Sequence, residues 1–188
     1  MTEEVGKPEK SGKRLSKNIL NIIRTTMRNN IELTHIADNK ANVLLSLNAL
    51  MLTFLIPSVI SNIDLIKERH LGIPLLIIIV TCMVTIYLSA LVLKPGDFDK
   101  YKLNHKNTFV SPFFFGNYYK MTSKEYDQYI TDAVSKEMLV RRHITQDLYY
   151  IGSRLGQKMS IIRNAFNIFL SGLILSIVAA AVAVLFFN

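Results

Sequence analysis

Three long runs without a charged residue constrain the fold of this chain more than any other feature of its sequence. They cover residues 41–60, 71–93 and 165–187. A helix of about 20 predominantly apolar residues is long enough to cross the hydrocarbon core of a bilayer. Buried helices of a large soluble protein would need far more polar surface than 188 residues supply when half of them are hydrophobic. We therefore predict an all-α membrane protein with three transmembrane helices.

Polar and small side chains within these runs indicate how the helices are used. The first run contains Ser46, Asn48 and Thr53, which are candidates to line a path through the membrane. The third run is rich in the small residues that let transmembrane helices approach closely. These residues are Gly172, Ser176, Ala179, Ala180, Ala181 and Ala183. We expect the third run to be both a span and a packing face.

The charge outside the runs predicts how the chain is oriented. Residues 1–40 hold eight Lys and Arg against five acids, residues 94–164 hold twelve against seven, and residues 61–70 hold two of each. Segments with an excess of Lys and Arg stay on the cytoplasmic side of a membrane. We therefore predict a multi-pass protein of a bacterial inner membrane, with a cytoplasmic N-terminus and a C-terminus outside.

The cytoplasmic segments are predicted to continue two of the spans as long helices. Apolar residues recur at three- and four-residue steps between residues 15 and 37 and again between 130 and 162, which is typical of amphipathic helices. The predicted parts are a basic flexible N-terminus over 1–14, an amphipathic helix over 15–40, and an aromatic segment with a stalk helix over 94–164. These extensions would bury their apolar stripes against each other and against neighbouring copies, which predicts a homo-oligomer.

An aromatic-rich segment, Phe109–Tyr119, lies within the third of these parts. Two interpretations remain open. The rings cap the apolar core of the stalk or lie at the level of the lipid headgroups, or they form a stacking platform for a base. Directly after this segment, Thr122 and Glu125 have the spacing of a capping box, which predicts that a helix starts there.

Motifs for catalysis are not found in the sequence. It has no Walker A loop, no dinucleotide-binding glycine pattern and no nucleophile elbow. The four histidines are scattered without metal-ligand spacing, and Cys82 is the single cysteine. The spans carry no paired ionisable groups of the kind that an intramembrane enzyme requires. We therefore predict that the chain is not an enzyme and holds neither a metal nor a cofactor.

The formal net charge of +8 predicts that the partners of the chain are anionic. Membrane lipid is the simplest such partner. Nucleic acid is not expected, because the sequence has no basic tail beyond residues 7–17 and no recognisable nucleic-acid-binding module.

Charged residues gather where the spans meet the predicted cytoplasmic side. Most of the Lys and Arg side chains here are expected to anchor the helices by extending toward the headgroups. Asp38 does not fit that description, because a carboxylate at a membrane boundary is usually paired. Lys158 or Arg163 is its candidate partner. The residues predicted to form a latch that controls gating are Asp38, Lys40, Asn48 and Arg163.

Several short segments follow one another in a characteristic order. They are Ala37-Asp38-Asn39-Lys40-Ala41, Leu47-Asn48-Ala49, Phe114-Phe115-Gly116, Asp147-Leu148-Tyr149, Gly152, Lys158 and Ile162-Arg163-Asn164-Ala165-Phe166. In their order and spacing they resemble the transmembrane effector family of Pycsar, the pyrimidine cyclase system for antiphage resistance. The resemblance extends over roughly residues 30–175, which is most of the chain.

The resemblance implies an effector that works with a partner pyrimidine cyclase. On phage infection such a cyclase makes cyclic CMP or cyclic UMP, and the activated effector impairs the membrane and kills or arrests the cell. The glycine-rich phosphate cassette of a cyclic-nucleotide-binding domain is missing from this sequence. A nucleotide would therefore have to bind the stalk and the aromatic segment. Its candidate contacts are Arg141, Arg142, Arg154, Lys158, Phe114 and Phe115.

A second function remains open. The long stalk suits equally a membrane anchor or adapter that recruits another protein and has no permeation activity. Oligomers that form constitutively and do not leak in the presence of ligand would favour the adapter.

Overall fold

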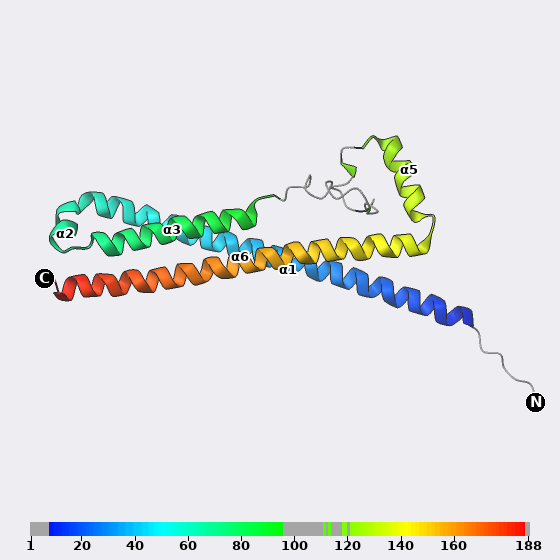
Figure 1. Cartoon of the computed structure of the whole chain (residues 1–188), viewed down its shortest axis with the longest axis horizontal. Helices are drawn as coiled ribbons and strands as arrows, with labels where there is room; N and C mark the ends of the chain where they lie inside the picture. The colour runs from blue at the N-terminus through cyan, green and yellow to red at the C-terminus, as the bar shows by residue number, and fades with distance from the viewer. Residues whose placement is uncertain (1–7, 96–110, 112, 114–117, 120, 187–188) are drawn as a thin grey trace, which may run out of the picture. The chain divides into compact units, whose positions relative to one another are not determined.

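The computed structural model describes residues 8–95, 111, 113, 118–119 and 121–186, with side chains from residue 17 onward. Its helices are α1 (Pro8–Ser61), α2 (Ile63–Glu68), α3 (Gly72–Leu93), α5 (Ser123–Val134) and α6 (Glu137–Phe186) (Figure 1). The described residues contain no strand. Three of the helices, α1, α3 and α6, are long and apolar enough to cross a membrane. The predicted fold class, all-α with three transmembrane helices and long helical extensions, is confirmed.

Helix α1 joins the predicted amphipathic helix and the predicted first span without a break over 54 residues. In the described residues it begins at Pro8, whereas the sequence predicted a helix start at residue 15. Proline suits the first turn of a helix, because the amide that it lacks would have no partner there. Pro57 lies inside α1 but close to its end at Ser61, where few backbone bonds remain to be disturbed.

The connection between the first two spans contains a short helix rather than a simple turn. Helix α2 ends at Glu68, and the Leu71 amide donates to the Ile66 carbonyl at 3.0 Å while the His70 amide donates to the Lys67 carbonyl at 3.4 Å. These two bonds form a Schellman motif. His70 takes the left-handed position of this motif, with φ of 54°, where glycine is the usual residue.

Helix α5 starts as the sequence predicts. The Thr122 side chain accepts a bond from the Glu125 amide at 3.3 Å, and the Glu125 carboxylate accepts one from the Thr122 amide at 2.8 Å, which completes a capping box. The Thr122 amide and the Thr122 hydroxyl both donate to the Glu125 carboxylate, and these two bonds lower the pKa of Glu125 because they stabilise its charged form. Helix α6 then runs for 50 residues and joins the stalk pattern to the last span, with Gly152 and Gly156 inside it.

The chain divides into two compact units, which we describe separately. The bundle unit comprises residues 34–95 and 155–188, and the extension unit comprises residues 1–33 and 96–154. Helices α1 and α6 each contribute residues to both units, α3 belongs to the bundle unit, and α5 belongs to the extension unit.

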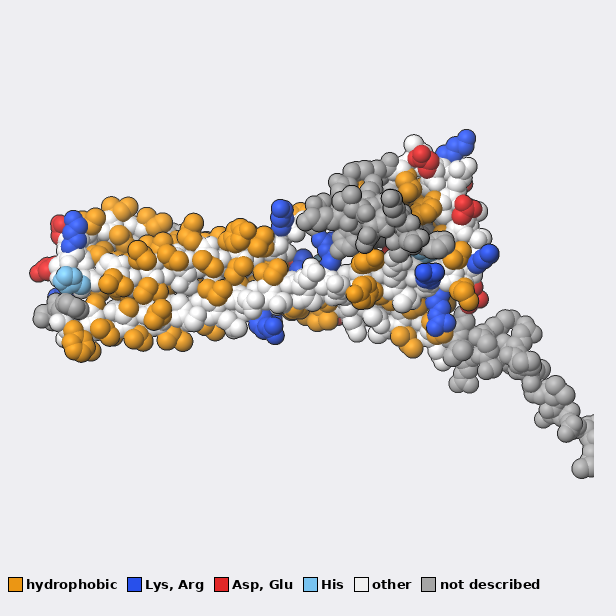
Figure 2. Space-filling view, in the orientation of Figure 1, with side chains coloured by type: hydrophobic (Ala, Val, Ile, Leu, Met, Phe, Trp, Pro, Cys, Tyr) orange, Lys and Arg blue, Asp and Glu red, His pale blue; other side chains and the backbone are white. Residues whose placement is uncertain are grey.

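The bundle unit has a small core where α1, α3 and α6 meet. Its fully or almost fully buried apolar residues are Ala41, Leu44, Val92, Ile162 and Ala165. In the most apolar stretch of α3, 33% of the residues are buried within the chain. In the corresponding stretches of α1 and α6, 11% are buried. Figure 2 shows hydrophobic side chains over most of the visible face around α3. Such a surface is expected of helices that lie in lipid.

Two of the small residues predicted in the third span, Gly172 and Ser176, pack against α3 within the chain. A side chain at Gly172 would collide with Thr81 of α3. One turn further along α6, the Ser176 hydroxyl donates to the Pro74 carbonyl at 2.9 Å, a carbonyl within the first turn of α3. The predicted packing face of α6 therefore lies against α3, and small residues allow the close approach.

Candidate functional site

An ion pair joins α1 to α6 within the bundle unit. The Lys158 ammonium donates to an Asp38 carboxylate oxygen at 2.6 Å. The two side chains are 25% and 33% exposed, so the pair is partly open to its surroundings. Of the two partners predicted for Asp38, the structure brings Lys158 to it. The role of the pair as a latch stays a prediction.

The residues around Asp38 explain why the two helices come close enough for this contact. Ala37 and Ala41, one on each side of Asp38 along α1, are both fully buried. On α6, Leu155 and Ile162 are buried on either side of Lys158. Because alanine side chains are small, the backbones of α1 and α6 can approach closely at this point, and the ion pair spans a short distance between them.

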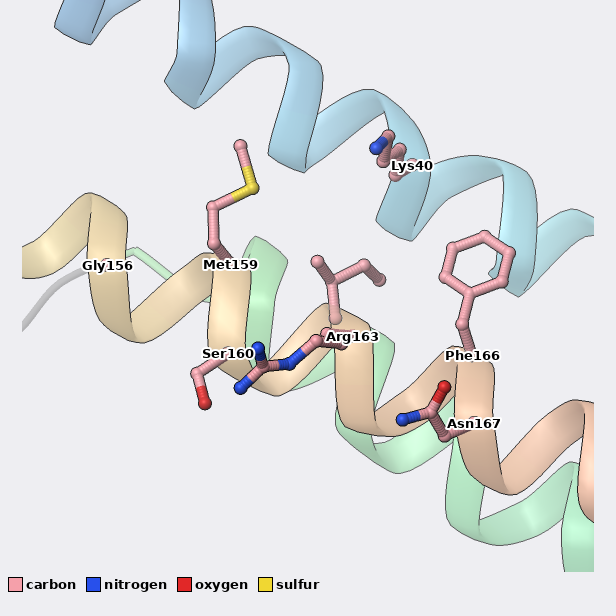
Figure 3. Close-up of a pocket in the computed structure, with 8 residues that line it drawn as sticks. Lys40, Gly156, Met159, Ser160, Arg163, Phe166 and Asn167 are labelled. Atoms are coloured by element: carbon pink, nitrogen blue, oxygen red, sulfur yellow. The ribbon is translucent and has the colours of Figure 1, made fainter.

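The other predicted latch cations lie beside this pair but do not join it. Lys40 and Arg163 are exposed and line a groove between α1 and α6 within the bundle unit (Figure 3). Among the described residues, neither forms an ion pair. The structure therefore brings three of the four predicted latch residues to one level of the α1–α6 contact, and it pairs one of them.

Asn48, the fourth predicted latch residue, lies deeper in the bundle. It is fully buried, its amide donates to the Leu44 carbonyl at 2.7 Å, and its carbonyl oxygen lies 2.9 Å from the Thr85 hydroxyl of α3. The other polar residues of the first span, Ser46 and Thr53, are exposed. The expected path-lining set is therefore divided, with one member inside the chain and two on its surface.

Thr85 belongs to a row of hydroxyl groups on α3. Thr81, Thr85 and Ser89 follow at four-residue steps and are all buried. The Thr81 hydroxyl bonds to the carbonyl four residues earlier, at 2.8 Å, whereas the buried Ser89 hydroxyl oxygen has no partner in the described part of the chain. The row places polar groups along the interior of an otherwise apolar bundle.

The cations predicted to contact a nucleotide are not gathered in one place. Arg141 and Arg142 are exposed neighbours near the start of α6. Arg154 follows Arg142 by twelve residues on that helix, which is about 18 Å at the rise of an α-helix. Lys158 belongs to the bundle unit and is bound to Asp38. The remaining candidates, Phe114 and Phe115, lie outside the described residues.

A buried polar cluster that the sequence did not predict lies in the extension unit. The Ser111 hydroxyl donates to the Asp147 carboxylate at 2.6 Å and accepts a bond from the Phe113 amide at 3.2 Å. Ser111 and His143 are 4% and 3% exposed. Because His143 and Asp147 are one turn apart on α6, their side chains share a face of the helix. These bonds attach the aromatic segment to α6 at Ser111.

Burial controls the titration of this cluster. It raises the pKa of Asp147 by disfavouring the charged carboxylate, while the bond from Ser111 and the positive charge of His143 act in the opposite sense. The pKa of His143 is lowered, first by burial and then by Arg142, against an opposing effect of Asp147. Burial and the charge of Asp147 together raise the pKa of Tyr129 on α5. These groups therefore respond to one another's charge.

Sequence reasoning missed this cluster because its members are far apart along the chain. Ser111 and Asp147 are separated by 36 residues. The spacing of His143 and Asp147 on one helix face is the single signal in the sequence that points to it. Aromatic packing occurs close by in the chain, where the rings of Tyr118 and Tyr126 lie 4.6 Å apart. In the described residues, no group of three His, Cys, Asp or Glu side chains is arranged to hold a metal ion.

Comparison with known proteins identifies the family of the chain. The family model of the Pycsar effector protein domain matches residues 21–186. Nothing among curated proteins and nothing among solved structures matches the chain. The matched range includes α3, α6 and the part of α1 from residue 21 onward, together with the Asp38–Lys158 pair and the Ser111–Asp147 cluster. The chain belongs to the Pycsar effector family.

Proposed function

We propose that this antiphage effector is activated by a cyclic pyrimidine nucleotide, cyclic CMP or cyclic UMP, and then impairs the inner membrane. The nucleotide is made by a partner cyclase, and the infected cell dies or stops growing. One observation carries the proposal: the effector family matches residues 21–186 in a chain with three helices that are able to cross a membrane.

The excess of Lys and Arg in residues 1–40 and 94–164 supports a cytoplasmic position for the extension unit. Three spans then place the C-terminus outside. The orientation is tested with single cysteines in a Cys82→Ala background, one at Ser123 and one at Asn62. A membrane-impermeant maleimide applied to intact cells should label the cysteine at residue 62 and not the one at residue 123. Labelling of residue 123 alone would reverse the orientation.

Damage to the membrane requires more than one copy of the chain in this proposal. Three helices pack around a core of buried side chains, and such a bundle does not enclose a channel. Most of the apolar surface of α1 and α6 remains available to other copies, and so do the exposed polar side chains of Ser46 and Thr53. Oligomers that bring these faces together would place polar groups along a shared interior.

The Asp38–Lys158 and Asn48–Thr85 contacts hold α1 to α6 and to α3 in the structure described. We assign this arrangement to the resting state. A ligand shifts a two-state equilibrium by its difference in affinity for the two states, so the nucleotide has to bind the active state more tightly. Arg141 and Arg142, which are exposed neighbours on α6, are its proposed phosphate contacts.

The proposal is tested by dye leakage from liposomes that contain the purified full-length chain. Cyclic CMP, cyclic UMP, cyclic AMP and buffer are compared, and leakage is expected with one of the two pyrimidine nucleotides. The double variant Arg141→Gln, Arg142→Gln should require a higher nucleotide concentration, whereas Lys124→Gln, which removes an exposed charge from α5, serves as the matched control. Silence with every nucleotide, despite confirmed insertion, would favour the adapter that recruits another protein.

A further inference from the structure

The groove between α1 and α6 combines charge and apolar surface at one level of the bundle unit. Its volume is about 700 Å³. Lys40 comes from α1, and the other lining residues come from α6 (Figure 3). These residues are Gly156, Met159, Ser160, Ile162, Arg163, Phe166 and Asn167. The groove is thus formed by two helices that both continue as spans.

The cations of this groove differ from the neighbouring Lys158. The charge of Lys158 is balanced by Asp38 at 2.6 Å. Lys40 and Arg163 are exposed, and in the described part of the chain they form no ion pair with an acid. Two positive charges from different helices therefore face one groove without an internal counter-ion. Ser160 and Asn167 add a hydroxyl and an amide to the same lining.

The position of the groove along the helices fits the boundary of a membrane. Lys40 is the last charged residue before the uncharged run that begins at residue 41, and Arg163 is the last charged residue of the chain. Beyond Arg163, the exposed side chains of Leu170 and Ile174 follow at helical spacing on the same side of α6, at 53% and 60% exposure. An apolar track therefore leads from the groove along the third span.

We propose that this groove binds an anionic phospholipid, with its phosphodiester between Lys40 and Arg163. Guanidinium and ammonium groups form short charge-assisted bonds to phosphate oxygens. Phe166 forms part of the apolar floor, and one acyl chain lies along Leu170 and Ile174. A cyclic nucleotide would satisfy the two charges but would leave that track uncovered. The bound lipid joins α1 to α6 beside the Asp38–Lys158 pair, and this site does not depend on nucleotide activation.

Simple anchoring to headgroups is the competing explanation of these cations. An anchor acts singly and has no need of a second cation on a neighbouring helix. Lys94, an exposed lysine directly after the end of α3, is such an anchor and does not line the groove. It is therefore a matched control for the removal of one charge at the membrane boundary.

The experiment counts lipids retained by the full-length chain in native mass spectrometry, with phosphatidylglycerol and phosphatidylcholine of identical acyl chains. The wild type should retain phosphatidylglycerol preferentially. The double variant Lys40→Gln, Arg163→Gln should lose about tenfold in affinity, as expected for lost charge-assisted bonds. The conservative pair Lys40→Arg, Arg163→Lys should keep most of the preference, and Lys94→Gln should keep it unchanged. Helical content by circular dichroism in phosphatidylcholine verifies that each variant folds.

Four results would overturn the assignment. They are equal retention of both lipids by the wild type, retention by the double variant at the wild-type level, an equal loss in Lys94→Gln, and displacement of the lipid by cyclic CMP or cyclic UMP at micromolar concentration. If the double variant differs from the wild type in oligomer size in phosphatidylcholine alone, and retains lipid as the wild type does, the groove binds a second copy of the chain instead.

Discussion

The bundle unit and the extension unit bury their polar side chains under different constraints. In the bundle unit the most deeply buried polar side chains, Asn48, Thr85 and Ser89, are uncharged. In the extension unit the buried cluster contains His143 beside the partly buried Asp147, both of which titrate. A span in lipid has no water to stabilise a charge, so neutral hydrogen bonds specify which helix faces meet. The extension unit retains groups that titrate and whose pKa values are shifted by burial and by one another's charge.

This contrast is sharpened by variants of the two units, which we order from the largest expected effect to the smallest. In the bundle unit the effects should come from packing, from neutral hydrogen bonds and from the Asp38–Lys158 ion pair. In the extension unit the effects should depend on the charge of Asp147 and His143.

Gly172→Ala is expected to have the largest effect on stability. The new methyl group would collide with Thr81, so α6 and α3 have to separate, at a cost of about 1–3 kcal/mol in the free energy of unfolding. Unfolding in detergent monitored by circular dichroism measures this. Gly156→Ala is the matched control on the same helix: no atom lies within 4 Å of its new methyl group, so it should be neutral or mildly stabilising. Equal effects at the two glycines would contradict the close contact between α6 and α3.

The Asn48–Thr85 hydrogen bond is expected to have the next largest effect. A double-mutant cycle with Asn48→Ala and Thr85→Val should give a coupling of about 0.6 kcal/mol, with an upper value near 1.7 kcal/mol, as found for hydrogen bonds between transmembrane helices. Thr53→Val is the control, because the exposed Thr53 hydroxyl bonds within its own helix at 2.8 Å. A coupling of zero would show that this bond does not hold α1 to α3.

Asp38→Ala should change stability less but should alter function. A partly exposed ion pair contributes at most about 1 kcal/mol, yet loss of the latch should raise toxicity in cells that lack the cyclase. Growth after induction is the measurement, and Asp64→Ala, which removes an acid from α2, is the control. The exchange Asp38→Lys with Lys158→Asp should restore growth. Normal growth of cells that carry Asp38→Ala, together with intact phage protection, would show that the Asp38–Lys158 pair does not act as a latch.

The smallest expected effect is a pH dependence centred on Asp147. Because burial raises its pKa, its contribution to stability is full below its ordinary value of 3.8 and is lost as the pH rises through the folded value. The midpoint of thermal unfolding of Asp147→Asn, relative to wild type, should therefore be higher at about pH 7.5 than at about pH 4. Thr85→Val should show the same difference from wild type at both pH values.

His143 acts in the opposite sense within the same cluster. Burial lowers its pKa, so its contribution to stability is present above its ordinary value of 6.5 and is lost as the pH falls through the folded value. His143→Gln should therefore lose less stability than the wild type when the pH is lowered. If both variants follow the wild type at every pH, titration of this cluster does not control the stability of the extension unit.

The three spans were predictable because their signal is local. A run of about 20 uncharged residues has to form a helix in lipid, since each backbone amide and carbonyl needs an internal partner there. The capping box at Thr122 was equally predictable, because its two residues are three positions apart. The partner of Asp38 was narrowed to two cations from sequence, since helical continuity placed Lys158 and Arg163 at a similar depth. Local sequence does not decide between those two.

Contacts between distant segments required the tertiary structure. Ser111 and Asp147 meet across 36 residues, and Asn48 and Thr85 meet across 37. Neither pair follows from periodicity, which gives the face of a helix but not the helix that it contacts. The predicted nucleotide contacts could not be tested from sequence for the same reason. The positions of the cations along α6 do not show that Lys158 is already bound to Asp38.

The sequence by itself thus determined the long helices, the spans, the family and the boundary at which charges gather, because each follows from neighbouring residues or from their order along the chain. Only the tertiary structure decided that Lys158 holds Asp38 while Lys40 and Arg163 face a groove, and that the small face of α6 lies on α3. These choices depend on which helix faces meet. That depends on side-chain volumes and hydrogen-bond partners brought together from across the chain.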